Sequence, residues 1–206
     1  MFVFDRNEFF EDYRSAFGPM TQYRVDALEF LLGEIEQDIR FDGTDTDRQQ
    51  LAYCLATFKW ETANTMRPID EHGSAAYFES RYGPHTSVGR RLGNLYPGDG
   101  NLFHGRGFVQ LTGRNNYERA GRFLNVDLIS NPDKAKEPKL AYQIAVQGMK
   151  EGWFTGKKLG QFIKDGVSPD YENARTIING HDKATTIADI ARRFDDLLRA
   201  SALQRS

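Results

Sequence analysis

Two acidic segments about ten residues apart carry the side chains best suited to acid–base chemistry. Glu61 follows the apolar stretch LAYCLATFKW, and Asp70 and Glu71 follow Pro68 in the segment RPIDEHG. Glycoside hydrolysis needs two carboxyl groups at the scissile bond, one to protonate the leaving oxygen and one to activate water. Glu61 and a loop carboxylate, Asp70 or Glu71, are therefore a candidate catalytic pair, and Glu79 is a further candidate for the second carboxylate.

A helix is expected to position Glu61. Apolar residues recur at spacings of three and four, which predicts a helix over about residues 48–64. These residues are Leu51, Cys54, Leu55 and Phe58. Glu61 lies at the edge of this apolar stripe, where partial burial favours the protonated form that a general acid requires. The structural alternative is a glutamate on the helix flank that pairs with an arginine. Cys54, on the stripe itself, is interpreted as a core residue rather than a nucleophile.

The segment FHGRGFVQLTGRNNY, residues 103–117, combines glycines, amides, arginines and a threonine around a short apolar run. Glycines let a backbone approach a ligand closely, and amide side chains both donate to and accept from the hydroxyl and N-acetyl groups of sugars. Residues 107–112 predict a short β-hairpin. We expect this segment to form one wall of a sugar-binding cleft.

The rest of the chain is dominated by helical periodicity. Helices are predicted from Phe9 to Phe17, after a cap at Thr21, and at about residues 75–82, 115–124, 138–153, 170–178 and 184–203. The region from 66 to 107 is rich in turn residues, as functional loops often are. The expected fold is mainly α, with a small β-hairpin at the cleft, in a single catalytic domain over residues 1–206 without a separate wall-binding module.

Composition excludes several functions. Lys and Arg number 27 and Asp and Glu 29, for a net charge of -2, which does not favour nucleic acid as the main partner. The single cysteine and the scattered histidines predict no disulfide, no metal site and no cofactor. No apolar run is long enough to span a membrane, and the start of the chain lacks a signal-peptide pattern.

Four motifs, in order along residues 50–180, resemble the family 19 chitinases and the related phage endolysins. Trp60-Glu61-Thr62 is similar to the family's His-Glu-Thr, and Thr65 to Gly73 match the phage-type continuation. His104 to Thr112, followed by Asn116-Tyr117, resemble the family's Tyr-Gly-Arg-Gly and Gln-Leu-Ser/Thr motifs. Residues 177–180, Ile-Ile-Asn-Gly, are the fourth motif. Trp60 and His104 depart from the pattern, and the missing disulfides favour the phage and bacterial branch.

The resemblance implies a lysozyme-like helical fold of two lobes and assigns roles by position. Glu61 becomes the general acid, Glu71 the general base, and Thr112 the hydroxyl that helps to hold the attacking water. Residues implied to bind substrate are Gln110, Asn116, Asn179, Arg106 and Tyr117. For Arg106, a structural ion pair is an equal alternative.

The function expected from these motifs is hydrolysis of β-1,4 links in peptidoglycan by an inverting, endolysin-type enzyme. Hydrolysis of chitin oligomers is the nearest alternative. A wall-peptide amidase and a non-catalytic glycan-binding module are alternatives from other classes. The endolysin interpretation implies a monomer that is made in a host cytoplasm, needs a holin-type pore for release, and acts on the wall in the periplasm.

Overall fold

A computed structural model describes residues 1–203 of the chain, which divide into two compact units. The first unit is discontinuous in sequence, since it joins Met1–Met66 to the segment that begins at Met149. The second unit is the intervening segment Arg67–Gly148. Glu61 belongs to the first unit and Glu71 to the second. The expectation that residues 1–206 act as one catalytic domain stays a prediction.

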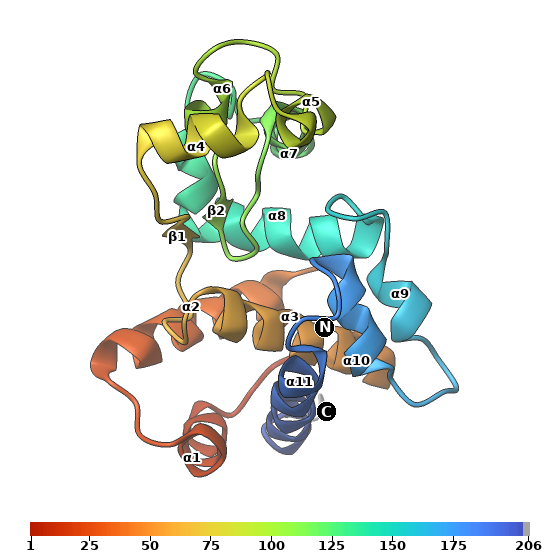
Figure 1. The fold of residues 1–206 in the computed structure, drawn as a ribbon. Helices are drawn as coiled ribbons and strands as arrows, with labels where there is room; N and C mark the ends of the chain where they lie inside the picture. The colour runs from red at the N-terminus through yellow and green to blue at the C-terminus, as the bar shows by residue number, and fades with distance from the viewer. Residues whose placement is uncertain (204–206) are drawn as a thin grey trace. The chain divides into compact units, whose positions relative to one another are not determined.

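The first unit is built from helices. They are α1 (Arg6–Phe17), α2 (Gln22–Gln37), α3 (Asp45–Glu61), α9 (Leu159–Phe162), α10 (Tyr171–Ala174), the 3₁₀ helix η2 (Arg175–Ile177) and α11 (Ala184–Ala200). Within this unit α3 packs most extensively against α11, and α10 also contacts α11 (Figure 1). The apolar stripe that the sequence predicts on α3 is buried, including Leu51, Cys54 and Phe58.

Capping residues fix the ends of α3. The Thr44 hydroxyl accepts a hydrogen bond from the Asp47 backbone N–H, and the Asp47 carboxylate accepts from the Thr44 N–H, so the helix begins at Asp45 rather than near 48. It ends at Glu61, because the next residues leave the helical conformation: Ala63 and Asn64 have φ of 49° and 66°. Glu61 is thus the last helical residue, three residues before the predicted end.

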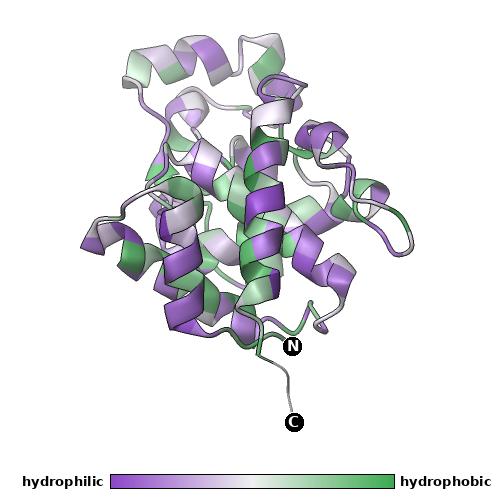
Figure 2. Ribbon diagram, turned by 90° about the horizontal axis from the view of Figure 1, so that it is seen from below, coloured by the Kyte–Doolittle hydropathy of each residue, from purple (hydrophilic) through white to green (hydrophobic). Residues whose placement is uncertain are grey.

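The helix α11 has one buried face and one exposed face. Its buried residues recur at helical spacing, and its exposed residues are largely polar (Figure 2). Beyond α11, Ala202 pairs with Phe4 in an antiparallel bridge, and the Leu203 N–H donates to the Val3 carbonyl at 2.9 Å. The chain segments at 3–5 and 201–203 are therefore hydrogen-bonded to each other.

The second unit combines short helices with one small sheet. Its elements are β1 (Ile69–Asp70), α4 (Ala75–Tyr82), α5 (Ser87–Arg91), α6 (Asp99–Leu102), β2 (Arg106–Gly107), α7 (Arg114–Leu124), the 3₁₀ helix η1 (Pro132–Lys136) and most of α8 (Pro138–Glu151). The two strands pair antiparallel, with Ile69 opposite Gly107 and Asp70 opposite Arg106.

The sheet differs in detail from the predicted hairpin over 107–112. Residues 106–111 do form a tight loop, closed by two backbone hydrogen bonds between Arg106 and Leu111 at 2.8 and 3.2 Å. The paired strand β2, however, finds its partner in β1, far away in the sequence. The contact between Arg106 and Leu111 is therefore local. The sheet pairs β1 with β2, which are far apart in the sequence, and hydrophobic periodicity does not reveal such a pairing.

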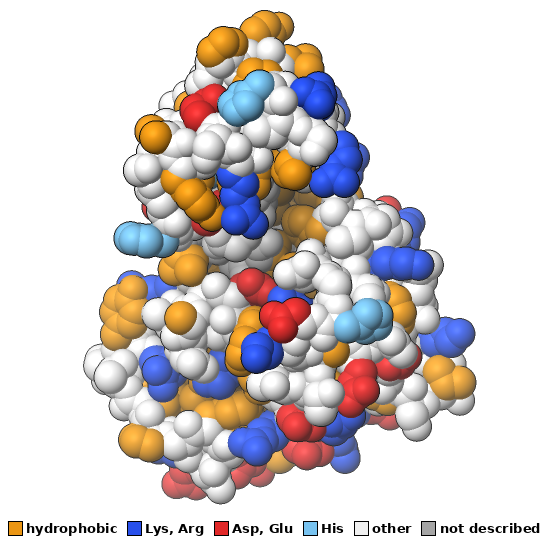
Figure 3. All heavy atoms as spheres, in the orientation of Figure 1, with side chains coloured by type: hydrophobic (Ala, Val, Ile, Leu, Met, Phe, Trp, Pro, Cys, Tyr) orange, Lys and Arg blue, Asp and Glu red, His pale blue; other side chains and the backbone are white. Residues whose placement is uncertain are grey.

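The predicted fold class, mainly α with a small β element, is confirmed. Among residues 1–203, no helix combines the length and apolarity needed to cross a bilayer. On the face drawn in Figure 3, acidic and basic side chains are interspersed over the elements of the first unit. The single-turn helices α5, α6 and α9 were not predicted, because one helical turn leaves too short a pattern for periodicity to detect.

Candidate functional site

Glu61 is held at the end of α3 by a buried arginine. Its Oε1 lies 2.5 Å from Nη1 of Arg175, whose side chain is only 3 % exposed, and the Glu61 side chain is 19 % exposed. The Arg175 Nε donates to the Asp182 carbonyl at 3.1 Å, which fixes the guanidinium from its other side. Partial burial and an arginine partner therefore both occur at Glu61. A fixed carboxyl group is what either a catalytic or a structural role would require, so the contact does not by itself decide between them.

Glu71 lies just after β1, and neutral donors hold it. Its Oε1 accepts from the Tyr82 hydroxyl at 2.8 Å, and its Oε2 accepts from the Gly105 backbone N–H at 3.1 Å. Its own backbone N–H donates to the Gly105 carbonyl at 2.7 Å, continuing the β1–β2 pairing by one residue. Strand pairing therefore places the Glu71 carboxylate on the loop that contains the Gly-Arg-Gly motif.

The loop 105–112 presents Gln110 beside Glu71. Phe108, Val109 and Leu111 are buried and anchor the loop, while Gln110 between them has a left-handed backbone, with φ of 57°. A non-glycine residue pays a conformational cost there. A Cβ on Gly105 would lie 2.7 Å from Gln110 Oε1 and 3.0 Å from Glu71 Oε2, so both side chains flank this glycine.

The Gln110 amide nitrogen is buried and has no hydrogen-bond partner within the part of the chain that the structure describes. Unsatisfied buried donors are costly and uncommon, and they often mark a place where a ligand or water completes the bonding. Gln110 thus combines an unfavourable backbone conformation with an unused donor, next to a carboxylate.

The other predicted polar residues are distributed over both units. In the second unit the Thr112 hydroxyl donates to the Gln110 carbonyl at 2.8 Å, and the Asn116 amide donates to the Thr112 carbonyl at 2.9 Å. In the first unit Asn179 is exposed, and its side-chain oxygen accepts from the Gly180 N–H at 2.9 Å. Thr112 and Asn116 therefore join Glu71 and Gln110 in the second unit.

Arg106 and Tyr117 are structural supports of the loop rather than exposed sugar contacts. Arg106 Nη1 donates to the Tyr117 hydroxyl and to the Leu102 carbonyl, both at 2.9 Å, and its Nε pairs with Asp133 at 3.0 Å. Tyr117 is fully buried, and its hydroxyl donates to the His104 carbonyl. Because these groups are buried and already bonded, the structure does not support the direct substrate contacts expected from the resemblance; for Arg106 it favours the ion-pair alternative.

The two alternative carboxylates are occupied by other contacts. Asp70 pairs with Lys136 at 2.6 Å and lies 3.3 Å from Arg106 Nε. Burial is the largest single influence on Asp70 and opposes its ionisation, but Lys136, His104 and Arg106 together outweigh it and lower the pKa of Asp70 below its ordinary value. Glu79 accepts from the Asn101 N–H at 3.1 Å and links α4 to α6. Glu71 is instead held by the Tyr82 hydroxyl and the Gly105 N–H, both neutral donors.

Cys54 is confirmed as a core residue. It is buried, and burial raises the pKa of its thiol to about 12, which disfavours the thiolate that a nucleophile needs. Within residues 1–203, no three His, Cys, Asp or Glu side chains are grouped as metal ligands would be.

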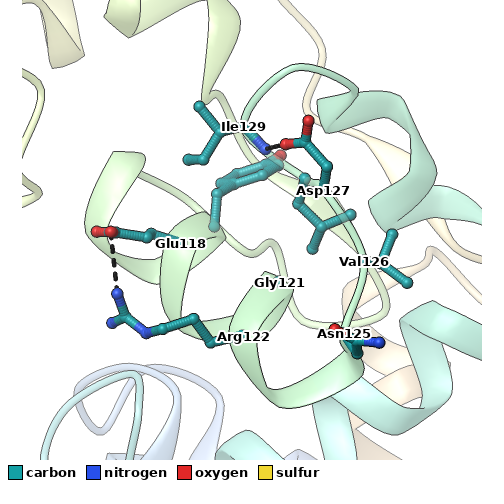
Figure 4. A pocket seen from close by; sticks show the side chains of 9 residues that line it. Glu118, Gly121, Arg122, Asn125, Val126, Asp127 and Ile129 are labelled. Carbon is teal, nitrogen blue, oxygen red and sulfur yellow. Dashed lines mark hydrogen bonds and ion pairs between the residues drawn. The ribbon is translucent and has the colours of Figure 1, made fainter.

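The second unit also has two surface hollows. One, of about 320 Å³, is formed by α7 and the loop that follows it, where Glu118 pairs with Arg122 and Asp127 caps the Ile129 N–H (Figure 4). The other, of about 450 Å³, has Arg106 and Asp133 in its wall. Glu61, Glu71 and Gln110 do not line either hollow.

Two residues of the site were missed from the sequence. Arg175 lies within the helix that the sequence predicts over 170–178, but nothing local shows that it reaches Glu61, 114 positions earlier. Tyr82 ends the AAYFESRY helix and reaches Glu71 across 11 positions. Both contacts are tertiary, and only a folded chain reveals them.

Comparison with known proteins covers much of both units. The family model described as chitinase class I, glycoside hydrolase family 19, matches residues 41–158, more than half of the chain. An acidic endochitinase of Petunia hybrida is 42 % identical over 107 residues, which cover 50 % of this chain and 37 % of the petunia protein.

Two solved structures share the fold. Chitinase C from Streptomyces griseus aligns with a TM-score of 0.62 and 19 % identity, over 99 % of this chain and 96 % of the other. A bacterial family 19 chitinase aligns with a TM-score of 0.58 and 19 % identity, over 99 % and 98 % of the two chains. At these identities the likeness establishes the fold alone.

Proposed function

The chain belongs to the chitinase class I family, glycoside hydrolase family 19, and from this premise we propose that it hydrolyses β-1,4 links between amino sugars. The curated relative described above and both solved structures are named as chitinases, which favours chitin over peptidoglycan as the substrate. The petunia enzyme is matched over only 37 % of its length, so its whole activity does not transfer automatically. We therefore give chitin oligomers first place and keep peptidoglycan as the alternative.

The proposed mechanism uses one carboxyl group from each unit. Glu61 protonates the glycosidic oxygen, and Glu71 removes a proton from the attacking water. The neutral donors on Glu71, Tyr82 and Gly105, fix its orientation without a competing cation. Thr112 helps to hold the water, while Gln110, Asn116 and Asn179 bind the sugar. An inverting reaction requires carboxyl groups roughly 6.5–9.5 Å apart, a separation that stays a prediction for this chain.

The observation that carries the proposal is the arrangement around Gly105. A carboxylate held by neutral donors and an amide with an unused, buried N–H flank the same glycine. A sugar N-acetyl carbonyl or hydroxyl is the kind of acceptor that such an amide can bind.

Digestion of purified chitin and purified peptidoglycan, side by side, tests the substrate. We expect reducing ends from chitin oligomers and products of inverted anomeric configuration when they are read by NMR. Retained configuration would defeat the assignment of Glu71 as a base. Muropeptide release without chitin cleavage would restore the peptidoglycan alternative.

The peptidoglycan alternative carries its own expectations. It implies release through a pore-forming partner and action on a bacterial wall, and both remain part of that proposal. Lysis that releases wall peptides instead of reducing sugar would point to an amidase. Binding to the glycan that survives with no turnover in the wild type would identify a non-catalytic module.

A further inference from the structure

Three buried hydroxyl groups in the first unit make no hydrogen bond of good geometry to any of residues 1–203. They belong to Tyr53 and Thr57 on α3 and to Tyr171 on α10, and all three residues are nearly inaccessible. A buried hydroxyl without a partner costs free energy, and folded proteins usually satisfy such groups with ordered water. Three together, in one unit, indicate a common cause.

Helical spacing and ring stacking connect the three residues to Glu61. Tyr53, Thr57 and Glu61 are spaced by four residues, so they share one face of α3. The Tyr171 ring stacks on the Tyr53 ring, with centroids 6.0 Å apart and planes within 10°. Four residues after Tyr171, Arg175 reaches the Glu61 carboxylate. We call Tyr171, Tyr53, Thr57 and Glu61 the polar strip.

The tyrosines of the polar strip are buried from solvent, and charged side chains lie near them. Burial is the main reason that the pKa values of both tyrosines are raised, so their hydroxyls stay protonated and can donate. On Tyr53 the nearby Thr57 hydroxyl has the next largest effect, followed by the charge of Arg175; both lower the pKa, and the charge of Glu61 raises it. On Tyr171 the charged groups are Asp195, Arg192 and Arg199 from α11 and Arg48 from α3.

We propose that ordered water occupies the polar strip, bonded to the Thr57 and Tyr53 hydroxyls, and hydrogen-bonds the Glu61 carboxyl group. Arg175 holds one oxygen of that carboxyl group, and the water holds the group from the α3 side. Thr57 and Tyr53 are then positioning residues that fix the orientation of Glu61. Their part in catalysis rests on the proposed function, while the water site itself does not.

Replacing Thr57 with Val tests the water, because Val keeps the shape and removes the hydroxyl. If water is bound there, Thr57→Val loses its bonds, and the melting temperature falls by several degrees. We also expect kcat to fall about tenfold with KM unchanged, because a misplaced acid affects the chemical step. Thr57→Ser, which keeps the hydroxyl, should restore kcat.

Either a rise in the melting temperature of Thr57→Val or an unchanged kcat would overturn the proposal. A rise would mean that the Thr57 hydroxyl is buried without any partner, and an unchanged kcat would mean that it does not position Glu61. Tyr53→Phe provides a second variant with the same expectations. The matched control is Tyr13→Phe, which removes a buried hydroxyl bonded to Lys59 on a different face of α3. It should lower the melting temperature and leave kcat unchanged.

A crystal structure separates this proposal from the proposed function. Electron density for water within about 3.2 Å of Thr57 Oγ1 is expected, and its absence from well-ordered density would refute the water site. If the wild type cleaves neither glycan, the proposed function fails, and the density and the melting temperature still decide whether water fills the strip.

Discussion

The two candidate carboxylates sit in opposite kinds of surroundings. Glu61 ends a 17-residue helix and is held by a buried cation, Arg175. Glu71 follows a two-residue strand and is held by a hydroxyl and a peptide N–H, both neutral. Glu61 in the first unit is thus held by an ion pair, and Glu71 in the second unit is held by hydrogen bonds from neutral groups.

This difference predicts how each site responds to change. Removing a partner from Glu61 leaves a partly buried charge uncompensated, and therefore affects stability as well as activity. Removing a partner from Glu71 loses a neutral hydrogen bond, which costs less, and should affect mainly the orientation of the carboxylate. The following variants test that contrast.

The largest effect is expected from removing the carboxylates themselves. Glu61→Gln and Glu71→Gln should each lower kcat by roughly 10²- to 10⁴-fold, because each removes one acid–base group. Binding of chitin oligomers should survive, which calorimetry can measure. If either variant hydrolysed its substrate at the wild-type rate, that carboxylate would have no catalytic role.

Arg175→Met should cost the first unit about 3 kcal/mol of stability, because it leaves Glu61 without its buried partner. The double variant Arg175→Met with Glu61→Gln should recover part of this loss, as urea unfolding would show. The matched control is Arg192→Met, which breaks the exposed pair with Asp189 and should cost less than about 1 kcal/mol. Equal losses in Arg175→Met and Arg192→Met would remove the contrast between the two sites.

Gly105→Ala tests geometry in the second unit. The added methyl would collide with Gln110 Oε1 and Glu71 Oε2, and displacing them should lower kcat/KM about 100-fold. Gly33→Ala in α2 is the control, since a Cβ there meets no atom within 4 Å, and it should leave activity unchanged. Steady-state kinetics on a chitin oligomer would measure both, and normal activity in Gly105→Ala would show that the loop can yield.

The lowered pKa of Lys59 makes the stability of the first unit depend on pH. Burial, aided by the charge of Arg24, lowers the pKa of this lysine to about 8, so between pH 8 and its ordinary value the unfolded chain binds the proton and the folded chain does not. Stability should therefore rise with pH in this window, by up to about 2 kcal/mol between pH 8 and 9.5. Urea unfolding of the wild type and Lys59→Met at both pH values should show the rise only in the wild type.

The smallest effect is expected from Tyr82→Phe. The variant removes one neutral donor from Glu71, and kcat should fall about tenfold with stability reduced by about 1 kcal/mol. Tyr77→Phe on the same helix removes a hydroxyl bonded to exposed Arg81 and should be silent. A loss of stability comparable to that of Arg175→Met would contradict the contrast.

Sequence predicted the long helices well, for physical reasons. The apolar stripe of α3 and the buried face of α11 repeat at helical spacing, so local pattern and tertiary burial agree. Fold class and the local Gly105 loop follow from the same kind of signal. The acid–base roles of Glu61 and Glu71 stay predictions.

What sequence could not predict depends on contacts between distant segments. The pairing of β1 with β2, the reach of Arg175 to Glu61 and the burial of Tyr117 all join residues that no local pattern relates. The family motif implied a substrate contact for Tyr117, whereas its ring is buried and its hydroxyl donates to the His104 carbonyl in support of the loop.

The discontinuity of the first unit has a consequence for biosynthesis. A ribosome delivers residues 67–148 as one uninterrupted segment, so contacts such as Tyr82 with Glu71 can form while translation continues. The helix that carries Glu61, α3, can pack against α11 only after α11 has been synthesised. The ion pair between Glu61 and Arg175 can form only after residue 175 has left the ribosome. Glu71 would therefore reach its final contacts before Glu61, although Glu61 comes first in the sequence.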